Sequence, residues 1–229
     1  MKQLHTKAIV LKRINFSEAE RILTVITPEQ GRVSMLAKGV RRAKSKLAGG
    51  LELFSESDIT YIDGRSELKT IISTRLNVHF NHIVEDIQKT MLAYDILQAV
   101  YENTQHGVES GTYDLLLSSL SYLNDKEANR DALLVWFTVH SLLLDGAGLN
   151  LEKPINKPKF EEQGSYQYSF DDRSFVCTEA GPYNPSHIKF LKLAVRAANP
   201  KKLEVIQHHE TLSGELASLI THILKMNKT

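Results

Sequence analysis

The spacing of apolar residues changes near residue 80, and this change constrains the fold more than any other feature of the sequence. Before it, short segments rich in Ile, Val, Thr and Leu are divided by turn residues, a pattern typical of β-strands. After it, apolar residues recur every three or four positions, which is typical of amphipathic helices. The sequence therefore predicts an α+β protein with a β-domain over residues 1–80 and an α-helical domain over residues 81–229.

Turn residues and connection lengths indicate how the strands of the first domain are joined. We expect five strands, at residues 7–16, 21–27, 32–38, 53–62 and 67–76. A type I turn signature, Pro28 to Gly31, joins the second and third strands, and Asp63-Gly64 marks a hairpin between the last two. Together with a longer connection that holds Val40 to Gly50, this order of strands and turns is typical of a five-stranded OB-fold β-barrel. The number of strands alone would also fit an SH3-like barrel.

The helical domain is expected to contain five helices and one irregular insertion. The first should run from Ile83 to near Gly107, and Thr112 should cap the second. Asn129 should cap a third, which is apolar on all sides and therefore the buried centre of the domain. Residues 146–183, rich in turn residues and alternating aromatics, are expected to form a loop and small hairpin. Two further helices are expected at 184–199 and 212–226.

The net charge of +1 conceals an uneven distribution. Residues 1–80 hold 14 Lys and Arg against 8 Asp and Glu, whereas the remainder holds 14 against 19. Lys38 to Lys46 contains five basic residues and no acid, which indicates either a solvated loop or a contact for a polyanion such as nucleic acid. The residues between these cations are mostly small, so they would not block the approach of a phosphate group to the basic side chains. The candidate nucleic-acid-binding residues are Arg13, Arg32, Lys38, Arg41, Arg42, Lys44 and Lys46.

The sequence shows few signs of base stacking, of catalysis or of a membrane span. The basic run has no aromatic for base stacking, and Phe16, Phe54 and Tyr61 could equally be core residues. No phosphate-binding loop, dinucleotide fingerprint, nucleophile elbow or metalloprotease motif occurs, so we expect no catalytic residue, no cofactor and no enzyme activity. His140 is expected to be a hydrogen-bonded core histidine. The single cysteine and the lack of a long apolar stretch favour a cytoplasmic protein without a membrane span.

Several segments of the first 80 residues resemble the N-terminal domain of the recombination mediator family RecO. They are Ala8 to Leu11, Ser17 to Arg21, Thr27 to Arg32, Ala37 to Arg42 and Leu51 to Phe54. The resemblance implies an OB-fold followed by a helical domain, binding of single- and double-stranded DNA, and annealing of complementary strands. It also implies RecR and the C-terminal tail of the single-stranded DNA-binding protein as partners, loading of RecA, and association with the nucleoid.

The helical half resembles the family less closely. Many members hold zinc there with four cysteines, whereas this chain keeps only Cys177, at a position like the third ligand. Residues 146–183 would then be a degenerate zinc-finger region, and we expect no metal, with His187, His208 and His209 in packing or surface roles. Two alternatives to a repair protein remain open: an OB-fold RNA-binding or translation-associated factor, and a protein-interaction adaptor.

Overall fold

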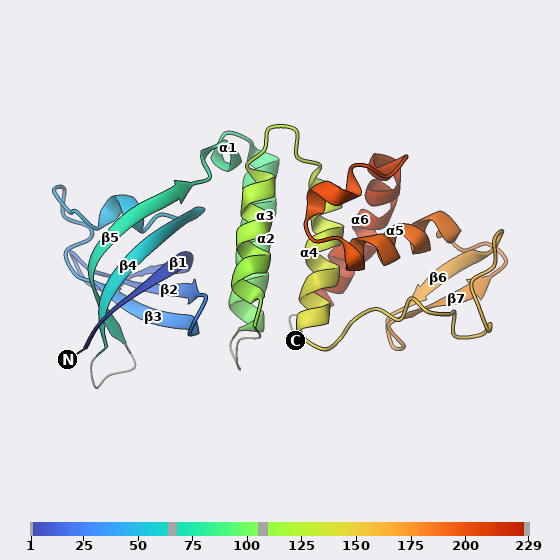
Figure 1. Cartoon of the computed structure of the whole chain (residues 1–229), viewed down its shortest axis with the longest axis horizontal. Helices are drawn as coiled ribbons and strands as arrows, with labels where there is room; N and C mark the ends of the chain where they lie inside the picture. The colour runs from blue at the N-terminus through green and yellow to red at the C-terminus, as the bar shows by residue number, and fades with distance from the viewer. Residues whose placement is uncertain (1, 64–67, 105–109, 227–229) are drawn as a thin grey trace. The chain divides into compact units, whose positions relative to one another are not determined.

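The structure is a computed structural model that describes residues 2–63, 68–104 and 110–226. The chain forms two compact units, Met1–Lys126 and Glu127–Thr229 (Figure 1), each treated by itself below. The first unit begins with five strands: β1 (Lys2–Asn15), β2 (Arg21–Thr27), β3 (Gly31–Ala37), β4 (Ser55–Asp63) and β5 (Lys69–His79). All five expected strands are present, with ends shifted by a few residues.

The strands close into a barrel in the order β1-β2-β3-β5-β4. β1 is long enough to pair with β4 from Lys2 to Ile9 and with β2 from Ile9 to Asn15, and its pairing with β2 shifts in register between Val10 and Lys12. The parallel pairing of β3 with β5 completes the ring. This closed five-stranded barrel is the expected OB fold. The expected Asp63-Gly64 turn lies outside the described residues, since Gly64 is not described.

Alternating side chains of the strands fill the barrel. Val10, Leu23, Met35 and Tyr61 are buried in its core, where residues at every second position of a strand point inward. Leu51 and Val40 enter the same core from the β3–β4 connection. The connection is therefore anchored to the barrel by its own apolar residues.

Three helices complete the first unit: α1 (Asn81–Val84), α2 (Ile87–Asn103) and α3 (Thr112–Leu123). The expected first helix is divided because the Asp86 side chain accepts hydrogen bonds from the N–H groups of Gln88 and Lys89 and caps α2. The prediction that Thr112 caps the next helix is wrong. Gly111, with a φ of 100°, holds the cap position, and Thr112 is the first helical residue.

The second unit surrounds α4 (Arg130–Leu144), whose side chains are mostly buried, as its all-round apolar sequence predicts. Asn129 caps α4 through the N–H of Ala132, as expected. A hairpin of β6 (Ser165–Ser169) and β7 (Ser174–Thr178) forms within the expected insertion, and α5 (Pro185–Arg196), the short helix η2 (Pro200–Leu203) and α6 (His209–Met226) follow. None of the helices in the described residues combines the length and apolar character that a membrane crossing needs.

The boundary between β-domain and helical domain expected at residue 80 coincides with the end of the strands. The compact units divide after Lys126 instead, because α1 to α3 belong to the same unit as the barrel. Whether residues 1–80 and 81–229 fold as separate domains stays a prediction.

Candidate nucleic-acid interface

The β3–β4 connection is an ordered turn structure that follows β3 directly. Gly39 has a φ of 67°, a left-handed conformation that residues with a Cβ rarely adopt, and it lets the chain turn back after Lys38. Backbone bonds from Arg42 N to Gly39 O (3.1 Å) and from Ser45 N to Arg42 O (2.9 Å) continue the turn. The short helix η1 (Ala48–Gly50) then leads into the barrel core at Leu51. The cations between these points are therefore held on a defined backbone.

Four cationic side chains of this connection point into solvent. Among the described residues, no hydrogen bond or ion pair is recorded for the side chains of Lys38, Arg42, Lys44 and Lys46, and all four are exposed. Val40, between them, is only 4% exposed, so the apolar and cationic groups of the connection are sorted to opposite sides. Unpaired, exposed cations on a fixed backbone can contact successive phosphates without first breaking internal interactions.

Arg41 joins this basic connection to the loop between β1 and β2. Its backbone N–H donates to the Ala19 carbonyl (3.1 Å), and its guanidinium donates to the Ser17 carbonyl (2.9 Å). A bond from Phe16 N to Glu20 O (3.1 Å) closes the loop itself. Arg41 is therefore a structural link as well as a cation.

Phe16 is the aromatic residue that this link places near the cations. Its side chain is 60% exposed, whereas Phe54 and Tyr61 are buried at 3% and 1%. The sequence left all three as possible core residues. The sequence placed Phe16 at the end of the first expected strand, residues 7–16, whereas β1 ends at Asn15 and Phe16 begins the polar loop that follows.

The other two predicted site residues have partners within the first unit. Arg13 on β1 forms an ion pair with Glu52. Arg32 on β3 donates to the Tyr101 carbonyl (3.1 Å), and its guanidinium lies 4.4 Å from the centre of the Tyr101 ring. Lys12 lies 4.6 Å from the same ring, so two barrel cations contact one α2 aromatic. The structure thus places Arg13 and Arg32 in contacts that hold the unit together.

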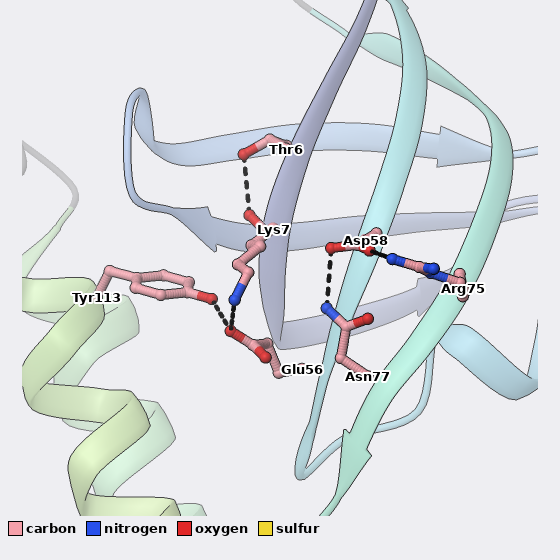
Figure 2. A network of polar contacts seen from close by, with 7 residues as sticks. All are labelled: Thr6, Lys7, Glu56, Asp58, Arg75, Asn77 and Tyr113. Atoms are coloured by element: carbon pink, nitrogen blue, oxygen red, sulfur yellow. Dashed lines mark hydrogen bonds and ion pairs between the residues drawn. The ribbon is translucent and has the colours of Figure 1, made fainter.

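A buried carboxylate forms a second link between the barrel and the helices. Figure 2 shows Glu56 of β4 approached by Tyr113 of α3 and by Lys7 of β1. The Tyr113 hydroxyl donates to Glu56 Oε1 at 2.7 Å, and Lys7 Nζ lies 3.5 Å from the same oxygen. Burial, and then the contact with Glu56, raise the pKa of the Tyr113 phenol. The bond fixes α3 against β4.

The neighbouring network on the barrel surface, also in Figure 2, involves Asp58, Arg75 and Asn77. Asn77 Nδ2 donates to Asp58 at 2.8 Å, and Arg75 pairs with the same carboxylate. These hydrogen bonds from Asn77 and Arg75 lower the pKa of the Asp58 carboxyl. Arg75, although exposed, is thus neutralised by a neighbour, in contrast to the cations of the β3–β4 connection.

The hairpin lobe of the second unit is held by side-chain contacts around Cys177. The Asn156 amide accepts from Cys177 N and donates to Cys177 O, both at 2.9 Å, which ties the preceding loop to β7. Tyr166, which pairs with Cys177 across the hairpin, and Phe175 are both fully buried. No group of three or more potential metal ligands gathers in the described part of the chain.

The three predicted non-ligand histidines differ in their surroundings. His187 is 2% exposed, its ring Nδ1 lies 3.1 Å from Asn184 N, and its Nε2 lies 2.7 Å from Glu215, so it packs α5 against α6. His208 is exposed and His209 begins α6. His140 also packs internally, with Nε2 3.1 Å from the Ala194 carbonyl, and burial lowers its pKa.

The chain thus begins with an OB-fold that carries a fixed, solvent-exposed cationic connection, and helices follow the barrel. The family described as Recombination protein O N terminal matches residues 1–78. "DNA repair protein RecO" of Desulfatibacillum aliphaticivorans is 30% identical over 188 residues, covering 79% of this chain and 72% of that protein. The proteins of the same name from Alkaliphilus metalliredigens and Caldicellulosiruptor saccharolyticus are 26% and 27% identical, and the matches cover 98% and 99% of this chain and 95% and 93% of theirs. The chain belongs to the RecO family of DNA repair proteins.

Proposed function

We propose that this protein binds single- and double-stranded DNA through the β3–β4 connection, anneals complementary strands and helps to load RecA during recombinational repair. The observation that carries the proposal is a set of four exposed cations on an ordered turn, Lys38, Arg42, Lys44 and Lys46, whose side chains have no hydrogen-bond or ion-pair partner among the described residues. Such a set releases counterions when it binds phosphates, and this release drives association with any nucleic acid strand.

Phe16 adds a contact that phosphates alone do not supply. An exposed aromatic beside exposed cations can stack on a base, and stacking favours single strands because their bases are accessible. The bonds from Arg41 to Ser17 and Ala19 keep the loop that carries Phe16 beside the cations. This arrangement supports binding without base-specific contacts, as strand annealing requires.

Annealing by this surface needs no catalytic side chain. Base pairing supplies the free energy, and the protein lowers the phosphate repulsion that keeps two strands apart. We therefore propose a non-enzymatic mediator without a cofactor or structural zinc. By resemblance to its family, its partners would be RecR and the C-terminal tail of the single-stranded DNA-binding protein, and it would act on the nucleoid in the cytoplasm.

The proposal is tested by a fluorescence assay in which two complementary oligonucleotides anneal with and without the protein. The wild-type protein should accelerate annealing, and a variant with Lys38, Arg42, Lys44 and Lys46 changed to Gln should lose most of the acceleration. A control variant removes the same charge at exposed lysines elsewhere, at Lys2, Lys126, Lys153 and Lys225. Equal loss in both variants would refute the assigned site, and absence of acceleration by the wild type would refute the function.

Binding of RNA oligonucleotides of the same sequence tests the first of the two alternatives, an RNA-binding or translation-associated factor. A protein of DNA repair should prefer the DNA oligonucleotide or bind both equally, because phosphate contacts do not discriminate between them. A clear preference for RNA would need contacts to the 2′-hydroxyl and would favour the RNA-binding factor instead.

A further inference from the structure

A second group of cations lies in the second unit, far along the sequence from the β3–β4 connection. Residues 180–203 contain five basic residues and no acid, although residues 127–229 as a whole hold equal numbers of each, twelve and twelve. The five are Lys189, Lys192, Arg196, Lys201 and Lys202, on α5 and η2. Figure 1 draws α5 beside the β6–β7 hairpin of this unit.

The cations of α5 share one face of the helix. Ile188, Leu191 and Ala194 are buried and turn the opposite face inward, whereas Lys189 and Arg196 are exposed. Lys192 is half-buried, with its ammonium 5.2 Å from the centre of the Phe160 ring. Lys189 and Arg196 are separated by about 10 Å along the helix axis, the rise of about three nucleotides of a B-form strand.

This arrangement disfavours the folded helix in the absence of a ligand. Lys189 and Lys192 are three positions apart, and Lys192 and Arg196 four, so both are like-charge pairs at neighbouring positions on the helix surface. No acidic residue stands three or four positions from any of them. Among the described residues, no ion pair is recorded for the side chains of Lys189, Arg196 or Lys202. The side chains of these three residues are therefore available for a polyanion, although Arg196 also lies in the last turn of α5, where a cation interacts favourably with the helix dipole.

Resting on the proposed function, we propose that the exposed cations of α5 and η2 form a second binding surface for the phosphate backbone of DNA. Annealing requires that two strands approach each other, and one chain with two cationic surfaces can hold both. A nucleic acid suits this face better than an acidic peptide, because a peptide is usually anchored by side chains in pockets or along a groove. The only large apolar side chain exposed on the described part of α5 is Leu193.

The test counts short single-stranded oligonucleotides bound per full-length chain, by native mass spectrometry and by titration at protein concentrations above the dissociation constant. The wild type should bind two. The α5/η2 variant, with Lys189→Gln, Arg196→Gln and Lys202→Gln, should bind one. The slope of its log binding constant against log salt concentration should become shallower by about two units, at about 0.7 per phosphate contact. A matched control, with Lys126→Gln, Lys153→Gln and Lys225→Gln, should bind two.

The outcomes separate this proposal from the proposed function. If the wild type binds one oligonucleotide, and only the four-residue variant of the β3–β4 connection loses it, the second surface is refuted while the function stands. If only the α5/η2 variant loses binding, the assignment to the β3–β4 connection is refuted instead. A poly-glutamate peptide that displaces the second oligonucleotide at equal charge concentration would also overturn the choice of DNA.

A second measurement excludes an indirect effect through folding. The α5/η2 variant removes repulsion between like charges, but it also removes the favourable cation Arg196 from the last turn of α5, so its thermal midpoint at low salt should lie close to that of the wild type. A midpoint that falls by many degrees would mean that these cations stabilise the fold, and would overturn the proposal.

Discussion

The Tyr113 hydroxyl of α3 donates a hydrogen bond to the buried carboxylate of Glu56. Glu56 is 5% exposed, and Lys7 is its other partner, at 3.5 Å. Tyr113→Phe would remove the bond and leave the carboxylate poorly satisfied, which should lower the free energy of unfolding by about 1–3 kcal/mol. Urea unfolding near pH 7 measures the change. Tyr94→Phe, at a tyrosine that is 50% exposed, is the control and should change stability little.

The same pair predicts a dependence on alkaline pH. The folded-state pKa of Tyr113 is raised, so its stabilising effect is complete below the unfolded pKa, about 10, and is lost as pH rises toward the folded value. The stability difference between the wild type and Tyr113→Phe should therefore shrink above about pH 10. A difference that grows with pH would contradict this assignment.

His140 predicts a pH dependence on the acid side. Burial lowers its pKa in the folded state, so it stabilises the fold fully above the unfolded pKa, about 6.5, and this contribution is lost as pH falls toward the folded value. Unfolding free energies measured between pH 7.5 and 5.5 should therefore fall more steeply for the wild type than for His140→Gln, which keeps a donor for the Ala194 carbonyl. Parallel curves would contradict the assignment.

At the scale of elements, Gly50 decides how closely η1 approaches β5. A Cβ at Gly50 would lie 2.6 Å from the Thr74 hydroxyl and 2.8 Å from its Cβ, whereas one at Gly49 would meet nothing within 4 Å. Gly50→Ala should therefore destabilise the protein by about 1–3 kcal/mol, the usual cost of overpacking. Gly49→Ala, the matched control, should be nearly neutral in the same unfolding measurement. Equal effects would show that the contact does not matter.

The hairpin lobe of β6 and β7 yields a prediction about metal. The Asn156 amide already bridges the loop to Cys177, and the lobe packs around Tyr166. We expect purified protein to contain no stoichiometric zinc and its thermal unfolding to be unaffected by a chelator. One zinc per chain in elemental analysis would overturn the expectation.

Local patterns predicted the elements well, because alternation, turn chemistry and caps act over a few residues. The five strands and the Asn129 and Asn184 caps follow from this. The buried face of α2 could not be predicted from such local patterns. Ile87 and Met91 belong to the apolar residues that recur every three or four positions there and predict the buried face, yet they are 70% and 57% exposed, while Lys89 is buried.

Distant contacts account for such differences. The Lys89 ammonium donates to the carbonyls of Asp125 and Lys126, partners that the sequence does not reveal. The same limit applies to the candidate site. The basic run was visible in the sequence, but the pairing of Arg13 with Glu52 and the contact of Arg32 with Tyr101 depend on the closed barrel.

At the scale of the whole molecule, the proposed contact with DNA lies on one connection of the barrel in the first unit. Helices α1 to α3 belong to that unit and are tied to the barrel by Tyr113 and Tyr101. Truncation after residue 80 would remove both ties, so variants of the full chain are the appropriate test of the site.

The most direct measurement is the salt dependence of binding to a fluorescent single-stranded oligonucleotide, followed by anisotropy between about 50 and 200 mM salt. Changing Lys38, Arg42, Lys44 and Lys46 to Gln should weaken binding and flatten the slope by about three units, at about 0.7 per phosphate contact. The Lys2, Lys126, Lys153 and Lys225 control should keep the wild-type slope. An unchanged slope in the first variant would contradict the central claim that the β3–β4 connection binds the phosphates of DNA.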